Sequence, residues 1–383
     1  MKNIYIMSIF LLLSLSSCSM KDMNALSSAL SSKDPSHSIG LLAKNKSMYY
    51  AKHPEKLQHD FKSLNKFVKN ISTNWGKENV EVPQPKEYVQ YMEEYKSRAI
   101  IDFEKGKIRV ETLGDKASLQ KSIVTTLLLP EDPRNVDLYG SKNIKLGGMP
   151  YLFGEVKDDT QKNIRYQWRA NRYAKILINE KFKTKKIKKD NKYITVNYVE
   201  FSMVKKHTNI RANKFKTFVQ KYAKKYNLQE SLVYAIIKTE SDFNQFAVSG
   251  AGAYGLMQIV PSTAGIDAYY FLYAKKIKPS KQYLLDPKNN IEMGTTYLHI
   301  LDKRYLKGIN NNLSREYCVI SAYNTGSGNV FKAFSTSRTA AKKKINTLSP
   351  QKVYSTLRAK LPYDETKNYL KKVVYSKKEF IRL

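Results

Sequence analysis

The chain has 383 residues, which is long enough for two domains of ordinary size. Apolar residues make up 42% and charged residues 26%, fractions typical of a folded soluble protein and not of a disordered one. The formal net charge is +34, from 67 Lys and Arg against 33 Asp and Glu. This charge favours an anionic partner, and nucleic acid, anionic lipid and an acidic cell-wall polymer all satisfy it. The alternative is a compositional bias, because the basic residues are spread along the chain.

The first residues have the pattern of an export signal. Lys2 precedes an apolar run from Ile4 to Leu15, which is too short to remain as a membrane span. The run ends in Leu-Ser-Ser-Cys at residues 15–18, which resembles a bacterial lipobox: small residues fit the peptidase and the thiol accepts the lipid. We expect a signal peptide at residues 1–17, lipid attachment at Cys18 and a Ser-rich tether at residues 18–50. An ordinary secretory signal with a chance Cys is the alternative.

The lipobox has consequences for location and redox state. Ser19 follows the Cys, and the resemblance to enterobacterial lipoproteins then implies anchoring in outer-membrane lipid, facing the periplasm. Export argues against nucleic acid as the anionic partner. If Cys18 is acylated, Cys318 has no other Cys for an intrachain disulfide, and its apolar surroundings predict a core residue.

Residues 51–206 have the pattern of an α+β accessory domain. Helical spacing predicts helices at residues 55–72, 86–97 and 115–128. The segment 99–113 alternates around Lys105-Gly106 and predicts a hairpin, and residues 164–178 and 192–204 are expected to form strands. The basic run at residues 181–192 is interpreted as a solvated face or loop. No catalytic pattern occurs here, so a structural or substrate-positioning role is expected.

Residues 207–383 are expected to form a mainly helical domain. A polar bridge at residues 207–213 leads into it, and a small strand is possible around residues 251–257. The predicted helices are at residues 212–226, 229–241, 261–274, 290–306, 314–324, 350–360 and 364–380.

Glu240 is the first candidate for a catalytic residue. Asn227 and Glu230 have the spacing of a capping box, and apolar residues such as Ile236 and Ile237 share a helix face with Glu240. The helix therefore places a carboxyl group at the rim of the core, where burial raises the pKa. A general acid for glycosidic cleavage needs that property. The alternative is a helix-end Glu that faces solvent.

A glycine-rich segment follows Glu240, and a second polar cluster follows later. The glycines at residues 250, 252 and 255 allow a tight turn and close approach of backbone to a ligand. Ser249 and Gln258 offer neutral hydrogen bonds, and Tyr323 and Asn324 add a hydroxyl and an amide. Such groups suit sugar hydroxyls and N-acetyl groups, although each of them alone also fits a core or capping role.

Four motifs in this order resemble the lytic murein transglycosylases of the soluble-transglycosylase type. They are Glu240-Ser241, the Gly-Leu-Met-Gln segment at 255–258, the Ala-Tyr-Asn segment at 322–324, and the tail 362-PYDETKNYLKKV-373. The tail departs from the family pattern at Lys367, where Arg is usual, and at Leu370, where Val is usual. Val260 stands where some relatives have Met. An α+β domain behind a lipobox further resembles the membrane-bound murein lytic transglycosylase C subfamily.

The resemblance implies a lysozyme-like fold for residues 207–383, with Glu240 as the single catalytic carboxyl and no metal or cofactor. It implies that Tyr323 positions Glu240 and that either Tyr363 or Tyr369 supplies a late tyrosine. The implied substrate-binding residues are Ser249, Met257, Gln258, Tyr323, Asn324, Tyr363 and Tyr369.

The absence of a clear second carboxylate distinguishes two reactions. Hydrolytic glycosidases normally use two carboxylates, and Asp242 and Asp267 are expected to cap helices or to face solvent. A single acid/base suffices when the 6-hydroxyl of N-acetylmuramic acid attacks, which leaves a 1,6-anhydromuramoyl end. The sequence therefore predicts a non-hydrolytic transglycosylase acting on peptidoglycan glycan strands. The rivals are a hydrolytic lysozyme on the same fold and a wall-binding lipoprotein without catalysis.

Overall fold

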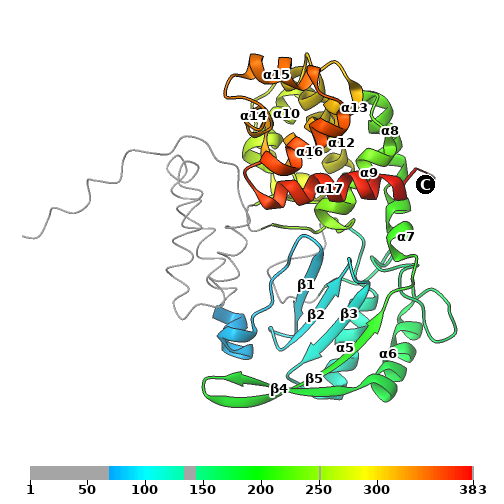
Figure 1. The fold of residues 1–383 in the computed structure, drawn as a ribbon. Helices are drawn as coiled ribbons and strands as arrows, with labels where there is room; N and C mark the ends of the chain where they lie inside the picture. Colours follow the sequence, from blue (N-terminus) through cyan, green and yellow to red (C-terminus); the bar gives the residue numbers. More distant parts are fainter. Residues whose placement is uncertain (1–68, 133–143, 250–251, 382–383) are drawn as a thin grey trace, which may run out of the picture.

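The computed structural model describes residues 69–132, 144–249 and 252–381 (Figure 1). An α+β part at residues 69–206, here the accessory domain, is followed by a mainly helical part at residues 207–381, here the helical domain, as the sequence predicts. Cys18, the signal peptide and the tether lie outside the described residues. Of the helix predicted at residues 55–72, only the end is described, and residues 69–75 are helical.

A five-stranded antiparallel sheet with the order β1-β2-β3-β5-β4 is the centre of the accessory domain. The hairpin predicted at residues 99–113 is confirmed: Ile101 pairs with Ile108, and Gly106 takes the left-handed φ of +63° in its turn. The strands are β1 (Glu87–Met92), β2 (Ser97–Asp102), β3 (Lys107–Thr112), β4 (Lys183–Lys189) and β5 (Lys192–Ser202).

Both faces of the sheet are covered. Helices α5 (Lys116–Leu127) and α6 (Gln167–Lys181) lie together on one face, where Leu119 and Leu177 join the core (Figure 1). On the other face, Trp75 and Ile71 pack against the sheet, and the guanidinium of Arg98 lies 3.9 Å above the Trp75 ring. Because both faces are covered, nearly every residue of β1 and β2 is buried.

Two elements of the accessory domain differ from the prediction. The helix expected at residues 86–97 is wrong, because β1 occupies Glu87–Met92 and alternate residues enter the cores on opposite faces of the sheet. The strand expected at residues 164–178 is also wrong, because α6 begins at Gln167 and buries Ala170, Ala174 and Leu177 at helical spacing. The basic run at residues 181–192 includes β4, an edge strand whose lysines are mostly exposed.

The helical domain contains most of the predicted helices. The helix expected at residues 261–274 is split into a π-helical turn η3 (Pro261–Gly265) and α10, and the one at residues 290–306 ends in a second π-helical turn, η4 (Leu301–Tyr305). Isolated bridges at Tyr254 replace the small strand. The sequence did not predict α11, α14 or α15. The helices are α7 (His207–Lys214), α8 (Lys216–Tyr226), α9 (Glu230–Ser241), α10 (Ile266–Tyr273), α11 (Lys281–Leu285), α12 (Pro287–Ile300), α13 (Asn312–Thr325), α14 (Ser327–Lys332), α15 (Arg338–Thr347), α16 (Pro350–Lys360) and α17 (Asp364–Glu379).

Two local predictions near the start of the helical domain are wrong. The polar bridge expected at residues 207–213 is part of α7, and its Arg211 is fully buried. Asn227 does not cap the helix that follows it; its φ of 51° ends α8 in the left-handed conformation that Asn tolerates. The N-cap of α9 is Gln229, without a side-chain capping bond. A short helix therefore replaces the expected polar bridge, and a left-handed helix end at Asn227 replaces the expected capping box.

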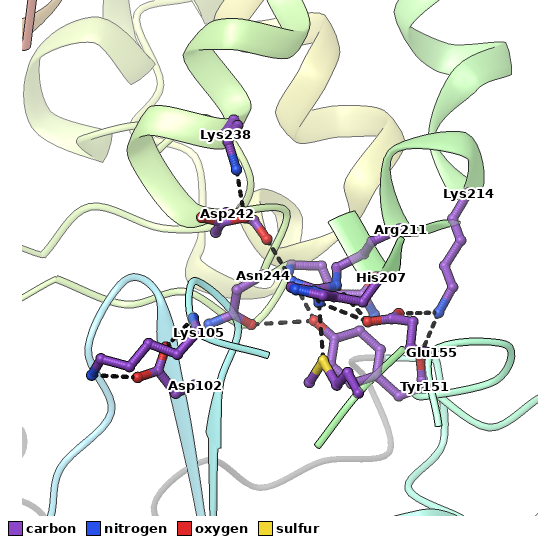
Figure 2. A network of polar contacts seen from close by, with 12 residues as sticks. Asp102, Lys105, Tyr151, Glu155, His207, Arg211, Lys214, Lys238, Asp242 and Asn244 are labelled. Carbon is purple, nitrogen blue, oxygen red and sulfur yellow. Dashed lines mark hydrogen bonds and ion pairs between the residues drawn. The ribbon is translucent and has the colours of Figure 1, made fainter. Parts of the chain in front are cut away.

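A buried polar network joins the two domains (Figure 2). Arg211 donates from Nε to the Glu155 carboxylate at 2.7 Å and from Nη1 to the backbone oxygen of Asp242 at 2.7 Å. Lys214 donates to the same Glu155 at 2.9 Å, and His207 Nδ1 lies 3.1 Å from Arg211 Nη2. The network thus connects the accessory domain to the residues just after α9.

Apolar packing reinforces this joint. Phe246 and Leu285 belong to the helical domain, yet both are buried in the core of the accessory domain. The Phe246 ring lies 4.7 Å from the Tyr151 ring and 5.3 Å from the Tyr88 ring, measured between centroids. Asn244 accepts a hydrogen bond from Tyr151 at 3.3 Å and donates one to the Pro85 carbonyl at 3.1 Å. The segment after α9 is therefore fixed by the accessory domain.

We predict that Glu155→Gln lowers the free energy of unfolding by about 3–5 kcal/mol, because it leaves the buried Arg211 without its carboxylate partner. Urea unfolding followed by circular dichroism measures the loss. Lys105→Met is the matched control, because it removes an ion pair to Asp102 whose lysine is 76% exposed, and it should unfold like the wild type. Equal stability of the Glu155 variant and the wild type would contradict a structural role for the network.

Candidate active site

Glu240 lies in the last turn of α9, and its neighbours fix that turn. Ile236 and Ile237 are fully buried and anchor the helix. The buried Ser241 hydroxyl donates to the Leu256 carbonyl at 2.7 Å, which ties the helix end to the glycine-rich loop. Asp242 then ends the helix with a left-handed φ of 50°. The position of Glu240 is therefore set by both its own helix and the loop that follows.

The carboxyl group of Glu240 has an unusual protonation equilibrium. Burial raises its pKa from the ordinary value to about 8, and the like charge of Glu365 acts in the same direction. The hydroxyl of Tyr369 and the positive charge of Lys86 lower it. Since burial is the largest of these causes, the group holds its proton at neutral pH. This agrees with the sequence-based expectation of an acid at the rim of the core.

Of the two tyrosines proposed from the tail, the structure brings Tyr369 to Glu240. Tyr369 is 6% exposed and lies on α17, which packs beside α9 (Figure 1). Within the described residues its hydroxyl forms no hydrogen bond of normal geometry, although it is close enough to Glu240 to lower that carboxyl's pKa. Tyr363 precedes α17 as its N-cap residue and is half-buried.

Tyr323 approaches the site from α13. Its hydroxyl donates to the Met257 carbonyl at 2.8 Å, and its ring lies 5.7 Å from that of Tyr297. Burial and the nearby Glu240 raise the pKa of Tyr323 well above its usual value. Its hydrogen bond therefore holds the loop beside the acid rather than the acid itself.

Asn290 of α12 organises the glycine-rich loop, and sequence reasoning missed it. Its side chain accepts from the Met257 amide at 2.7 Å and donates to the Tyr254 and Leu284 carbonyls at 2.8 and 2.7 Å. A Cβ at Gly255, where φ is +74°, would lie 2.4 Å from both Asn290 Nδ2 and the Leu284 oxygen. Only glycine fits there. The available signal was an Asn in the first turn of a predicted helix, which is weak without the loop in view.

Met257 does not lie where a sugar contact requires. Its side chain is fully buried in the core of the helical domain. It packs so closely on α12 that a Cβ at Gly294 would be 2.3 Å from Sδ. The Met257 side chain therefore has no surface to offer, and its contribution to the site is the backbone carbonyl that Tyr323 binds.

The other predicted polar residues are partly exposed near the loop and α13. Gln258 has a φ of 47°, and its amide nitrogen donates to the Gly255 carbonyl at 2.9 Å. Ser249 accepts from the Ala253 amide at 3.0 Å. Asn324 accepts from the buried Thr366 hydroxyl at 2.7 Å, which connects α13 to α17. Each side chain is oriented by at least one internal hydrogen bond and keeps part of its surface accessible.

The carboxylates considered as second catalytic groups are engaged elsewhere. Of the two roles expected for Asp242, capping is confirmed and exposure is not: it is the C-cap residue of α9 and is fully buried, with its carboxylate 3.5 Å from Lys238 Nζ. Asp267 is partly buried and accepts from the Tyr305 hydroxyl at 3.1 Å. Glu365 at the start of α17, which sequence reasoning missed, is the carboxylate whose charge acts on Glu240. No group of three or more His, Cys, Asp or Glu suited to a metal occurs in the described part of the chain.

Comparison with known proteins assigns a family to both domains. Residues 50–214 match the family "Membrane-bound lytic murein transglycosylase C, N-terminal domain", and residues 217–346 match "Transglycosylase SLT domain". Membrane-bound lytic murein transglycosylase C of Serratia proteamaculans is 42% identical over 323 residues, which are 83% of this chain and 89% of that protein. The chain belongs to the membrane-bound lytic murein transglycosylase C family. The corresponding Yersinia pestis protein is 41% identical over the same shares.

Membership in the lytic murein transglycosylase C family makes the protein an enzyme of the transglycosylase class, and the helical domain is its SLT domain. The 70 kDa soluble lytic transglycosylase from Escherichia coli is 28% identical over 43% of this chain, with a TM-score of 0.33. Its complex with bulgecin A has a TM-score of 0.35 and 27% identity over 44% of this chain. The matches span 23% and 25% of those two chains.

The names of these relatives say that they are membrane-bound. Across residues 69–132, 144–249 and 252–381, none of the helices has both the length and the apolar character that crossing a bilayer requires.

Cys318 is a core residue, as its apolar surroundings predict. It is fully buried on α13 and unpaired, and burial raises the pKa of its thiol to about 12. A thiol with so high a pKa is largely protonated at neutral pH and is a poor nucleophile.

Proposed function

We propose that the protein cleaves the β-1,4 bond between N-acetylmuramic acid and N-acetylglucosamine in peptidoglycan, without water, and that Glu240 is its single general acid/base. The observation that carries this proposal is the half-buried Glu240 at the end of α9, where desolvation raises the pKa of the carboxyl to about 8. A protonated carboxyl beside sugar-binding groups is what glycosidic cleavage needs. The family membership supports the choice of substrate.

The proposed reaction uses Glu240 twice. First, its proton passes to the glycosidic oxygen as the bond to C1 of N-acetylmuramic acid breaks. The Glu240 carboxylate then takes the proton of the 6-hydroxyl of the same sugar, and the freed oxygen bonds to C1. The products are a free 4-hydroxyl on N-acetylglucosamine and a 1,6-anhydromuramoyl end, and Glu240 regains its proton.

A carboxyl that acts as acid and then as base works best when its pKa lies near the working pH. Burial raises the pKa, whereas Tyr369 and Lys86 limit the rise. The buried Tyr369 hydroxyl lies at the Glu240 carboxyl, so it is in position to interact with that group during both proton transfers. We propose Tyr369 as the late tyrosine of the site.

Sugar contacts are proposed for the partly exposed polar residues. The Gln258 amide oxygen and the Ser249 hydroxyl suit the acetamido and hydroxyl groups of the sugars, with Asn324 and Tyr323 on α13 as further contacts. Tyr363, which is half-buried just before α17, is a further candidate for a sugar contact. We leave out the Met257 side chain because it has no exposed surface.

A hydrolytic lysozyme is the second candidate function, and Glu365 is the observation that favours it. This exposed carboxylate acts on Glu240 and could orient a water molecule. The products separate the two reactions, since hydrolysis leaves reducing ends and transglycosylation leaves 1,6-anhydromuramic acid.

We predict that Glu240→Gln lowers the rate of sacculus digestion by at least about 10²–10⁴-fold, because the amide can neither donate nor accept the catalytic proton. Release of anhydromuropeptides from purified sacculi, followed by chromatography and mass spectrometry, measures the rate. Glu230→Gln is the matched control, since Glu230 is an exposed residue in the first turn of the same helix.

Three outcomes of this experiment are informative. Normal digestion by the Glu240 variant would remove Glu240 from the mechanism. Reducing ends without anhydromuramic acid would replace the proposal with hydrolysis. Binding of sacculi without turnover by the wild type would favour the non-catalytic wall-binding protein.

We predict that kcat/KM falls on the alkaline side with an apparent pKa near 8. The acid must be protonated to start the reaction, so activity is present below the raised pKa of Glu240 and is lost as the pH rises through it. An ordinary Glu would lose its proton near pH 4.3. A pH–rate profile from about pH 4 to about pH 10 measures this alkaline limb, the range over which the rate falls as the pH rises. Activity that is already lost at about pH 5 would contradict the raised pKa.

We infer that the protein is anchored by acyl chains on Cys18 in the outer membrane and faces the periplasm. Two or more acyl chains anchor a protein stably, whereas one does so only marginally. We predict that Cys18→Ala moves the protein from the membrane fraction to the soluble fraction, as measured by density-gradient fractionation of cells. Cys318→Ala is the matched control and should stay with the membrane. Retention of the Cys18 variant in the membrane would contradict lipid anchoring there.

A further inference from the structure

The accessory domain brings a cation to the active site. Lys86 lies in the turn before β1, and the backbone on both sides of it is fixed. The Phe103 amide donates to the Lys86 carbonyl at 3.0 Å, and Asn244 of the helical domain donates to the Pro85 carbonyl at 3.1 Å. The position of Lys86 is therefore determined by the domain joint.

Two carboxylates hold the Lys86 side chain, which is 23% exposed. Its ammonium lies 2.6 Å from Glu104 Oε1 and 3.8 Å from Asp242 Oδ2. Asp242 follows Glu240 by two residues and is fully buried, whereas Glu104 is 58% exposed at the turn between β2 and β3. The ammonium thus bridges the turn between β2 and β3 and the end of α9.

The charged and titratable groups around Glu240 come from two helices and one turn. Tyr369 and Glu365 lie on α17, Tyr323 lies on α13, and Lys86 comes from the accessory domain. Among the described residues that act on Glu240, Lys86 is the one cation; its charge favours the carboxylate, with a smaller influence than burial, Tyr369 or Glu365. Glu365, a like charge on α17, has the opposite influence.

We propose that Lys86 is a positioning residue for catalysis: it stabilises the carboxylate that forms when Glu240 gives its proton to the leaving oxygen. The proposal rests on the proposed role of Glu240. Negative charge develops on Glu240 during bond cleavage, and a fixed cation nearby stabilises that charge without reorganisation. The accessory domain then takes part in the chemistry through its electrostatic field, without touching the reacting atoms.

Glu104 offers a test with the opposite sign. It is hydrogen-bonded to Lys86, and it also lies near Lys372 of α17, so its pKa is lowered. Removing this anion leaves the charge of Lys86 less compensated. Removing Lys86 itself takes the cation away. The two substitutions should therefore move the protonation of Glu240 in opposite directions.

The experiment measures pH–rate profiles on sacculi for the full-length protein and three variants. We expect Lys86→Met to lower the plateau rate by about tenfold, less than the 10²–10³ lost with a donor directly on an oxyanion. We expect its alkaline limb to move to higher pH, because the protonated form of Glu240 persists longer. Lys86→Arg should keep the wild-type limb, and Glu104→Gln should move it to lower pH.

A structural role alone gives a different result. If Lys86→Met lowers the thermal unfolding midpoint and the rate but leaves the limb in place, Lys86 only holds the domains together and the proposal fails. It also fails if Lys86→Arg shifts the limb as far as Lys86→Met does. An active Glu240→Gln variant would instead refute the proposed function, whatever the limb does, so the two failures are distinguishable.

Discussion

The buried guanidinium of Arg211 connects the two halves of the molecule, because it binds the Glu155 carboxylate of the accessory domain and the Asp242 carbonyl of the helical domain. Arg211 is held in turn by Glu155, so a charge pair of the joint is linked to the backbone two residues after Glu240. Phe246, a few residues further on, is packed inside the accessory domain. The end of α9 is therefore fixed from both sides, and a shift of one domain relative to the other would displace Glu240, the proposed acid.

The environment of Glu240 depends on segments that are distant in the sequence. Its helix supplies the carboxyl, α17 supplies Tyr369 more than a hundred residues later, and the turn before β1 supplies Lys86. The glycine-rich loop is held beside Glu240 because Asn290 accepts a hydrogen bond from the Met257 amide and Tyr323 donates one to the Met257 carbonyl. No local segment could produce the raised pKa alone, because burial requires all of these elements at once.

The candidate acid and the helical domain could be predicted because their signals are local. The apolar period of α9 and the order of short motifs are visible in a few residues each. β1 and α6 could not be assigned reliably: β1 is buried on both faces and lacks alternation, and α6 is rich in aromatic and branched residues. Arg211 and Lys86 resemble ordinary surface cations in the sequence, and only the folded contacts distinguish them. Met257 was misjudged because membership in a motif does not indicate which way a side chain points.

In the proposed mechanism, the use of one carboxyl for two proton transfers explains why opposing influences meet at Glu240. A strongly raised pKa would hinder donation to the leaving oxygen, and an ordinary pKa would leave the group ionised before the substrate arrives. Burial and Glu365 favour the protonated form, whereas Tyr369 and Lys86 favour the carboxylate. An enzyme with two carboxylates can divide these demands between them. In the proposed reaction a single residue satisfies both, so the balance comes from its neighbours, and a separate domain supplies part of it through Lys86.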